Sequence, residues 1–216
     1  MVLRLLLIIF LTMLQPVYSE TLLESQDDQN TILVMGDSLS AAYGIDTSDG
    51  WVNLLRVQLK EYDSRYQWQV INASVSGDTT TGGLERLPKL MDTHRPVLCI
   101  IALGANDGLR GQSLDLMYQN LQDMITLCNS VGQTLLIGIR LPPNYGERYT
   151  QAFHKVYISL ANNNNIELVA FMLEGIALED KYFQADRLHP TAAAQPFILD
   201  TIWAQLKPII DEVKSS

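Results

Sequence analysis

Residues 97–103 read VLCIIAL, an uninterrupted run of apolar side chains. A strand with one face in water alternates polar and apolar residues, so a continuous run of this length indicates a strand that is buried on both faces. Strands of that kind belong to parallel sheets that helices cover on each side. This stretch therefore predicts a layered α/β fold.

The rest of the chain repeats an alternation of strand-like and helix-like segments. Further β-rich apolar runs occupy residues 31–35, 68–73, 134–139 and 166–171. Apolar residues at helical spacing occupy residues 51–62, 83–93, 113–130, 151–162 and 191–213. Five strands that alternate with five helices predict a parallel sheet between two helical layers. No internal repeat or linker divides the sequence, so residues 31–214 are predicted to form one domain.

The composition excludes several classes of protein. Hydrophobic residues make up 47% of the 216-residue chain, which is too many for a disordered protein. Lys and Arg number 15 against 24 Asp and Glu, for a net charge of -9, and no basic cluster stands out. Nucleic acid is therefore not an expected partner, because its binding depends on cations that pair with phosphates. The 2 cysteines are too few for a disulfide scaffold.

Residues 1–19 have the organisation of a secretory signal. Arg4 gives a positive start, residues 5–14 are almost entirely apolar, and small residues follow at plausible cleavage positions. The apolar run is far shorter than the roughly 20 residues needed to span a bilayer. We therefore expect residues 1–19 to be removed, residues 20–30 to form a flexible leader, and the mature protein to be exported without a membrane span.

Residues that can do chemistry follow several of the predicted strands. In a parallel sheet of this kind, reactive groups gather in loops at the carboxyl ends of the strands. Ser38 follows the first strand, Gly77 the second and Asn106 the third. Asp186 and His189 stand three residues apart in a later loop, just before the last helix. We therefore expect all of them to meet at one edge of the sheet.

Together, these residue types meet the requirements of ester hydrolysis. That reaction needs a nucleophile, a base, a group that orients the base, and donors for the oxyanion. Ser38 is predicted to be the nucleophile, His189 the base and later the acid, and Asp186 the group that orients the imidazole. The predicted oxyanion donors are the backbone N–H groups of Ser38 and Gly77 and the side-chain amide of Asn106. Each residue alone is a weak signal, but the combination predicts a serine hydrolase.

The other histidines and the cysteines do not suggest a competing site. His94 precedes the third strand, at the opposite edge of the sheet, and His154 lies in a helical stretch, so both are expected to be solvated. No His or Cys pair has the spacing of zinc ligands, and no metal site is predicted. Cys99 lies in a strand and Cys128 in a helix; a disulfide between them stays open, but two buried thiols are favoured.

With these motifs in this order, the sequence resembles the SGNH hydrolases, a superfamily of GDSL-type esterases and lipases. The segments that carry the resemblance are residues 36–40 (GDSLS), Gly77, residues 104–107 (GAND) and residues 186–190 (DRLHP). The resemblance implies a flavodoxin-like, three-layer αβα fold with strand order 2-1-3-4-5. It also implies hydrolysis of acyl esters and thioesters without a metal or a cofactor.

Three further segments are similar to one subgroup of that superfamily. They are residues 72–78 (NASVSGD), 106–111 (NDGLRG) and 140–146 (RLPPNYG). The subgroup consists of exported bacterial enzymes with acyl-CoA thioesterase, lysophospholipase and arylesterase activity. The likeness implies small acyl ester or thioester substrates and a location in the periplasm or the medium. We also expect a monomer.

The choice of substrate is less well determined than the reaction. Leu109, Leu141, Pro142 and Tyr145 stand near the expected site and are candidates for an apolar acyl groove. The alternative, that Leu141 and Tyr145 only pack a long loop, stays open. Two other functions also stay open: a carbohydrate acetyl esterase of the same superfamily, and an exported ligand-binding module that has lost the chemistry.

Overall fold

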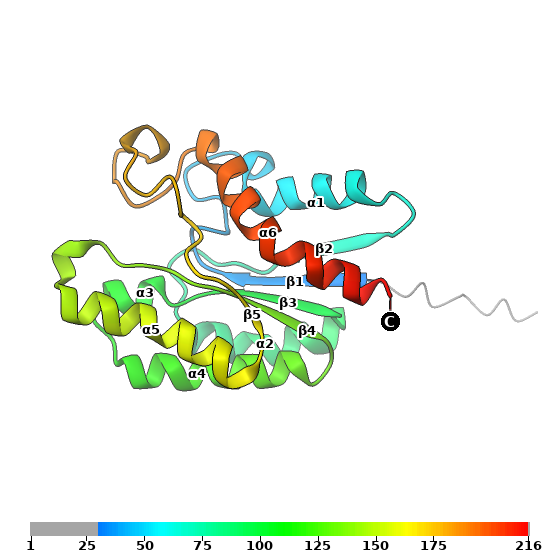
Figure 1. Cartoon of the computed structure of the whole chain (residues 1–216), viewed down its shortest axis with the longest axis horizontal. Helices are drawn as coiled ribbons and strands as arrows, with labels where there is room; N and C mark the ends of the chain where they lie inside the picture. The colour runs from blue at the N-terminus through cyan, green and yellow to red at the C-terminus, as the bar shows by residue number, and fades with distance from the viewer. Residues whose placement is uncertain (1–29, 216) are drawn as a thin grey trace, which may run out of the picture.

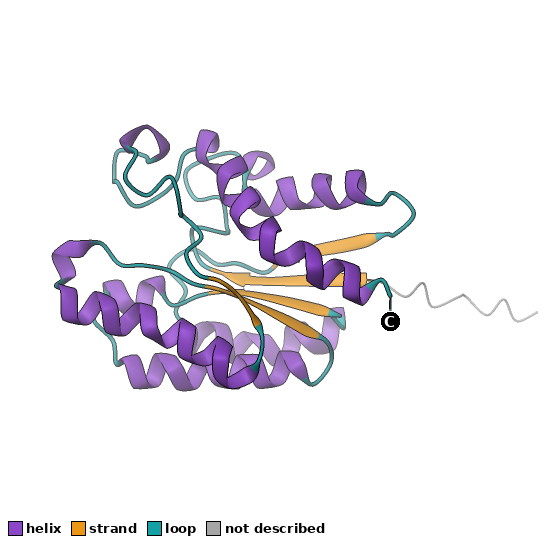
Figure 2. Ribbon diagram, viewed as in Figure 1, coloured by secondary structure: helices purple, strands orange, loops and turns teal. Residues whose placement is uncertain are grey.

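The computed structural model describes residues 30–215, which form a five-stranded parallel sheet between two layers of helices (Figures 1 and 2). The sheet order is β2-β1-β3-β4-β5, as the sequence analysis predicts. The strands are β1 (Asn30–Gly36), β2 (Trp68–Asn72), β3 (Leu98–Ala102), β4 (Gln133–Ile137) and β5 (Glu167–Val169). The predicted signal, and the predicted leader up to residue 29, lie outside the described residues.

Helices cover both faces of the sheet. One face carries α1 (Trp51–Tyr62) and α6 (Gln195–Val213), and the other carries α2 (Thr80–His94), α4 (Leu114–Asn129) and α5 (Glu147–Asn164) (Figure 1). The shorter elements are α3 (Ala105–Leu109) and the 3-10 turns η1 (Thr47–Asp49), η2 (Pro143–Tyr145), η3 (Asp180–Tyr182) and η4 (Ala192–Ala194). None of the helices between residues 30 and 215 is long and apolar enough to cross a membrane.

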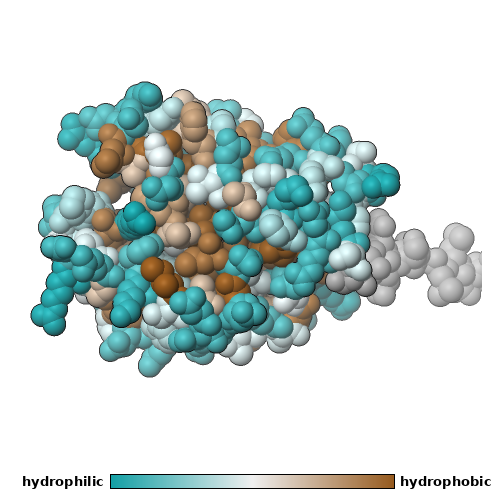
Figure 3. Space-filling model, in the orientation of Figure 1, coloured by the Kyte–Doolittle hydropathy of each residue, from teal (hydrophilic) through white to brown (hydrophobic). Residues whose placement is uncertain are grey.

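The core explains the continuous apolar run of β3. Every residue of this central strand is buried, because it has a neighbour on each side and a helical layer on each face. Trp51 from α1 packs between the sheet and the helices on one face, Tyr157 from α5 does so on the other face, and both are fully buried. In the middle of the face shown in Figure 3, apolar side chains gather between α5 and α6.

Several elements differ from the sequence prediction. Helix α5 begins at Glu147, four residues earlier than predicted, and α6 begins at Gln195, four residues later. Helix α2 begins at Thr80, three residues earlier than predicted, because two successive glycines weaken the helical pattern of its first turn. Strand β5 covers only Glu167–Val169 of the predicted residues 166–171, because the chain leaves the sheet there for a long loop. Helix α3 was not predicted, since five residues are too few to show a helical period.

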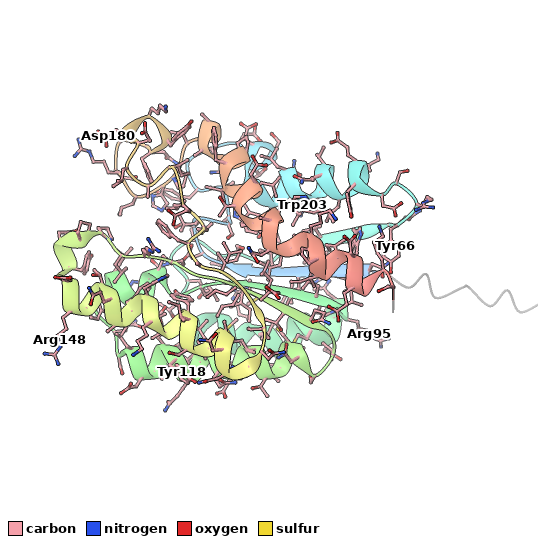
Figure 4. All side chains as sticks on the ribbon, viewed as in Figure 1. Tyr66, Arg95, Tyr118, Arg148, Asp180 and Trp203 are labelled. Atoms are coloured by element: carbon pink, nitrogen blue, oxygen red, sulfur yellow. The ribbon has the colours of Figure 1, made fainter. Side chains whose placement is uncertain are left out.

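The sheet has a switch point between β1 and β3. The chain leaves β1 towards the α1 face and leaves β3 towards the α4 face. The two strands are in register, with Gly36 opposite Ala102, so they end at the same level. Ligands of open parallel sheets bind where connections diverge in this way. In Figure 4, Asp180 and Arg148 lie at this end of the molecule, and Tyr66 and Arg95 lie near the other end.

Both cysteines are buried and free, as predicted. Cys99 lies in β3 and Cys128 in α4. A hydrogen bond with Cys128, together with burial, raises the pKa of the Cys99 thiol far above its usual range. The Cys99 thiol therefore does not have the character of a nucleophile.

The turn after β3 requires a glycine, and the matched pair Gly104→Ala and Gly111→Ala tests this. Gly104 has φ 117°, and a Cβ there would lie 2.3 Å from the hydroxyl of Tyr157. Gly111 has φ 64° but no atom within 4 Å of the position of a Cβ. We expect Gly104→Ala to lower the free energy of unfolding by about 3 kcal/mol, and Gly111→Ala by about 1 kcal/mol.

Equilibrium urea unfolding of both variants measures this difference. Equal losses for the two alanines would show that crowding by Tyr157 contributes nothing.

Candidate active site

The structure brings Ser38, His189 and Asp186 together at the switch point. Ser38 stands in the turn after β1, and the other two residues come from the loop between η3 and η4. The Ser38 Oγ lies 2.9 Å from Nε2 of His189. The other ring nitrogen, Nδ1, lies 2.6 Å from Oδ2 of Asp186. The hydroxyl, imidazole and carboxylate thus form a continuous chain of hydrogen bonds, as the sequence analysis expects.

The Asp186 carboxylate is held within its own turn. Its Oδ1 accepts the backbone N–H of Leu188 at 2.9 Å and that of His189 at 3.0 Å, which leaves Oδ2 for the imidazole. The backbone N–H of His189, its imidazole and the N–H of Leu188 lower the pKa of the Asp186 carboxyl to about 2. The carboxylate is therefore charged at neutral pH and fixes the orientation of the ring.

Two backbone donors at the site are free to bind a substrate oxygen. Among residues 30–215, neither the Ser38 N–H nor the Gly77 N–H donates to a protein acceptor. Gly77 has φ 81°, a conformation that a glycine adopts without strain and that leaves no side chain over its N–H. Both N–H groups follow strand ends at the same edge of the sheet, as predicted.

The amide of Asn106 is oriented by the loop after β2. Its Nδ2 donates to the backbone oxygen of Asp78 at 2.9 Å and lies 3.5 Å from Oδ2 of Asp37. Arg86 holds the Asp78 loop in turn, because its guanidinium binds the Asp78 carboxylate and donates to the backbone oxygen of Ala73. The Asn106 amide thus donates to two acceptors of the protein, and the contact with Asp37 is the longer of the two.

A buried network fixes α3, the short helix that carries Asn106. The carboxylate of Asp107 accepts the backbone N–H of Thr80 at 2.9 Å and its hydroxyl at 2.6 Å. Asn120 from α4 donates to the hydroxyls of Thr80 and Thr81. The Asp107 carboxylate therefore satisfies a free N–H at the start of α2 and joins three helices at the edge of the site.

One contact at the site is not visible in the sequence. The guanidinium of Arg110 donates to the backbone oxygen of Gly77 at 2.9 Å and so connects the end of α3 with the loop that carries Gly77. The sequence shows only that Arg110 follows Asn106 by about one helical turn, and this spacing does not identify Gly77 as the partner.

The candidate groove residues lie together, but they differ in exposure. Leu141 is buried, with 7% of its surface exposed, and packs against Gly108, so it lies beneath the more exposed candidates. Leu109 and Pro142 are half-buried, and Tyr145 is 37% exposed. The Tyr145 hydroxyl donates to the backbone oxygen of Leu109 at 3.1 Å, which joins η2 to the end of α3.

Two shallow surface depressions lie beside Tyr145, over the start of α5. They measure about 400 and 420 Å³, and both are lined by Glu147, Arg148 and Ala152. Tyr145 lines the larger of the two, and Ser38 lines neither. Neither depression is therefore a candidate for the place where the reacting bond of a substrate would meet Ser38.

The other histidines lie away from Ser38. His94 ends α2, at the opposite edge of the sheet, and it is half-buried and not solvated as expected. His154 in α5 was expected to be solvated, but it is half-buried, and burial together with the charge of Arg140 lowers its pKa. Within residues 30–215, no group of three or more His, Cys, Asp or Glu side chains is arranged to hold a metal ion.

A layered parallel sheet that joins a hydroxyl, an imidazole and a carboxylate at its switch point has the architecture of a hydrolase. Comparison with known proteins gives the same class. Residues 34–195 match the GDSL-like Lipase/Acylhydrolase family. The chain belongs to this family, and it is a hydrolase.

Three relatives are similar over most of their length. Esterase TesA of Pseudomonas aeruginosa is 48% identical over 190 residues, which cover 88% of this chain and 94% of the relative. An arylesterase of Vibrio mimicus is 43% identical over 176 residues, 81% of this chain and 87% of the relative. The thioesterase 1/protease 1/lysophospholipase L1 of Escherichia coli K12 is 41% identical over 186 residues, 84% and 86% of the two chains.

Solved structures agree with the fold. A crystal structure of TesA superposes with a TM-score of 0.80 at 48% identity, covering 83% of this chain and 99% of that one. The psychrotrophic esterase EstA from Pseudoalteromonas sp., inhibited by monoethylphosphonate, gives 0.79 at 38% identity, covering 85% and 100%. AlinE4, an SGNH-hydrolase family esterase, gives 0.68 at 34% identity, covering 86% and 96%. The predicted SGNH fold is confirmed.

The carboxyl group next to Ser38 should make stability depend on pH. Asp37 is buried, and burial raises its pKa to about 6 from an ordinary 3.8, although the N–H of Leu39 and the nearby His189 act in the opposite direction. Because the pKa of Asp37 is higher in the folded chain than in the unfolded chain, its protonated carboxyl contributes its full stabilisation below about pH 4. This contribution is lost as the pH rises through about 6.

Asp37→Asn removes that titration. We expect the free energy of unfolding of the variant, relative to the wild type, to rise by about 2 to 3 kcal/mol between pH 4 and pH 7. Urea unfolding at a series of pH values measures it, with the exposed Asp49→Asn as control. A difference that does not change with pH would contradict the role of burial.

Proposed function

We propose that this hydrolase cleaves acyl esters and thioesters through a covalent acyl-enzyme on Ser38. The observation that carries the proposal is the chain of hydrogen bonds from Ser38 Oγ through His189 to Asp186, at 2.9 and 2.6 Å. A serine hydroxyl is a weak nucleophile until a base takes its proton, and a neutral imidazole at hydrogen-bond distance is such a base. The names of the relatives, which include an esterase, an arylesterase and a thioesterase, support the same chemistry.

The first half of the reaction forms the acyl-enzyme. Ser38 Oγ attacks the carbonyl carbon of the substrate, and its proton moves to Nε2 of His189. The imidazolium that results is stabilised by the charged Asp186 carboxylate, which accepts the Nδ1–H. His189 then gives the proton to the departing alkoxide or thiolate as the carbon–oxygen or carbon–sulfur bond breaks.

The negative charge that develops on the carbonyl oxygen needs donors in fixed positions. The free N–H groups of Ser38 and Gly77 supply two of them, and the Asn106 amide supplies the third when its long contact with Asp37 gives way to the substrate oxygen. Removing one such donor typically costs about 3 kcal/mol of barrier. Because Arg110, Asp78 and Asp107 hold these donors in the resting protein, they need not reorganise during the reaction.

The second half of the reaction releases the acid. A water molecule takes the position of the leaving group, and His189 accepts one of its protons as it attacks the acyl carbon. The tetrahedral intermediate collapses, Ser38 recovers its proton from the imidazole, and the carboxylic acid leaves. The proposed steps use only these side chains, the oxyanion donors and water.

Replacement of the nucleophile tests the proposal directly. A fluorophosphonate probe should label Ser38, and Ser38→Ala should abolish both labelling and hydrolysis of p-nitrophenyl butyrate. Ser130→Ala, at the exposed end of α4, is the matched control and should retain both. Hydrolysis that survives in Ser38→Ala would rule out the proposed nucleophile.

The orienting carboxylate has a conservative test of its own. Asp186→Asn keeps an oxygen for the backbone N–H groups of Leu188 and His189 but no longer holds the imidazole in the required tautomer. We expect kcat to fall by about 10³ to 10⁴-fold with little change in the melting temperature. A loss of less than tenfold would mean that the carboxylate does not orient the base.

We also propose that Leu109, Pro142 and Tyr145 line the wall that receives the acyl chain, with buried Leu141 as their support. Leu109 follows Asn106 by three residues, the Tyr145 hydroxyl donates to the backbone oxygen of Leu109, and a chain bound to Ser38 has to pass close to the oxyanion donors. Contact with apolar surface stabilises each methylene by up to about 0.8 kcal/mol. The wall should therefore favour longer chains.

Tyr145→Ala tests the wall. We expect the ratio of kcat/KM for p-nitrophenyl dodecanoate to that for p-nitrophenyl butyrate to fall about fivefold, since about 40 Å² of apolar contact is lost. Tyr118→Ala in α4 provides a tyrosine control away from the wall and should leave the ratio unchanged (Figure 4). An unchanged ratio in Tyr145→Ala would place the acyl chain elsewhere.

A further inference from the structure

An aromatic ring lies against the imidazole of His189. The centroid of the Tyr43 ring is 4.4 Å from that of the imidazole, and the two planes are inclined by 41°. Tyr43 is 51% exposed, so burial in the core does not account for its position. The ring covers one face of the imidazole, while Asp186 and Ser38 occupy its two nitrogens.

The backbone beside Tyr43 adopts an uncommon conformation. Four non-glycine residues between positions 30 and 215 have positive φ. Two of them, Arg95 and Asn165, end helices α2 and α5, where this conformation is ordinary. The other two are Ala42, which precedes Tyr43, and Arg187, which lies inside the turn of the orienting carboxylate. Strain of this kind gathers at functional sites, and here it occurs in both turns that meet at the imidazole.

Gln184 ties these two turns together. Its Nε2 donates to the backbone oxygen of Tyr43 at 2.8 Å and to that of Pro190 at 3.0 Å. Its own backbone N–H donates to the backbone oxygen of His189 at 2.8 Å. Its Oε1 packs against Gly44, where a Cβ would lie only 2.2 Å away. One side chain thus fixes the separation of two segments that are 141 residues apart in sequence.

We propose that Tyr43 and Gln184 are positioning residues for His189. The Tyr43 ring blocks rotation of the imidazole out of the line between Asp186 and Ser38, and Gln184 holds the Tyr43 turn at the correct distance from the turn of His189. Neither residue touches the reacting atoms. Their effect is geometric, and a displacement of about 1 Å at a reacting group can cost about 100-fold in rate. This inference rests on the proposed function of His189 as the base.

Substitution of the ring separates its packing from its hydroxyl. We expect Tyr43→Leu to lower kcat on p-nitrophenyl butyrate about 10- to 100-fold, with KM changed less than about threefold. Tyr43→Phe keeps the ring and should keep kcat within about twofold of the wild type. Gln184→Met keeps the length of the side chain without its donors and should lower kcat about tenfold.

Tyr66→Leu is the matched control. Tyr66 also packs against an aromatic ring, that of Trp68 at 5.1 Å, but at the other end of the molecule (Figure 4). The kcat of Tyr66→Leu should equal that of the wild type. A kcat for Tyr43→Leu within twofold of the wild type, or a Tyr43→Phe as defective as Tyr43→Leu, would overturn the inference.

A crystal structure of Tyr43→Leu supplies a readout that does not depend on activity. We expect the imidazole to leave its position, with Nε2 of His189 more than about 3.5 Å from Ser38 Oγ, beyond hydrogen-bond distance. An imidazole that stays in place would overturn the positioning role. A wild type that hydrolyses no ester and takes up no fluorophosphonate would instead refute the proposed function, and the position of the imidazole would still decide this inference.

Discussion

The pairing of β1 with β3 is the constraint on which the rest of the molecule depends. The two strands end level, with Gly36 opposite Ala102, and the chain leaves them towards opposite faces of the sheet. The crevice between the diverging connections lies beyond the strand ends, so Ser38 and Asn106 fall on its two sides. Gly36 is required at this point, because a Cβ would lie 2.7 Å from the side chain of Ser40.

Hydrogen bonds of buried groups then give this edge its rigidity. Asp107 reaches from α3 to the start of α2, and Arg86 joins the end of β2 to the loop that follows it. Buried polar groups stabilise a single arrangement only when they are paired, and the carboxylate of Asp107 is paired at both oxygens. The backbone N–H groups of Ser38 and Gly77 remain unpaired within the described part of the chain, which is the arrangement that electrostatic preorganisation of the proposed oxyanion donors requires.

Much of the fold could be predicted because the three middle strands of the sheet, β1, β3 and β4, are buried and therefore almost continuously apolar. The start of α2 at Thr80 could not, since the carboxylate that accepts its N–H comes from Asp107, far along the chain. The residues that we propose to react could be selected from the sequence as well, because Ser38 stands at a strand end and belongs to a known combination of residue types. Tyr43 and Gln184 gave no such signal, since their contacts exist only once distant turns meet.

The turn that carries Asp186 and His189 is largely self-contained. The carboxylate binds both the backbone and the ring of a residue only three positions away, so the Asp186 carboxylate and the His189 imidazole form one local unit. The tertiary structure then has to hold this unit at the correct distance from Ser38, so that Nε2 of His189 stays within hydrogen-bond distance of Ser38 Oγ. The segment between β5 and Gln184 contributes no hydrogen bond to this unit of carboxylate and imidazole, so a change in its length or sequence would alter one side of the site while the unit keeps its internal geometry.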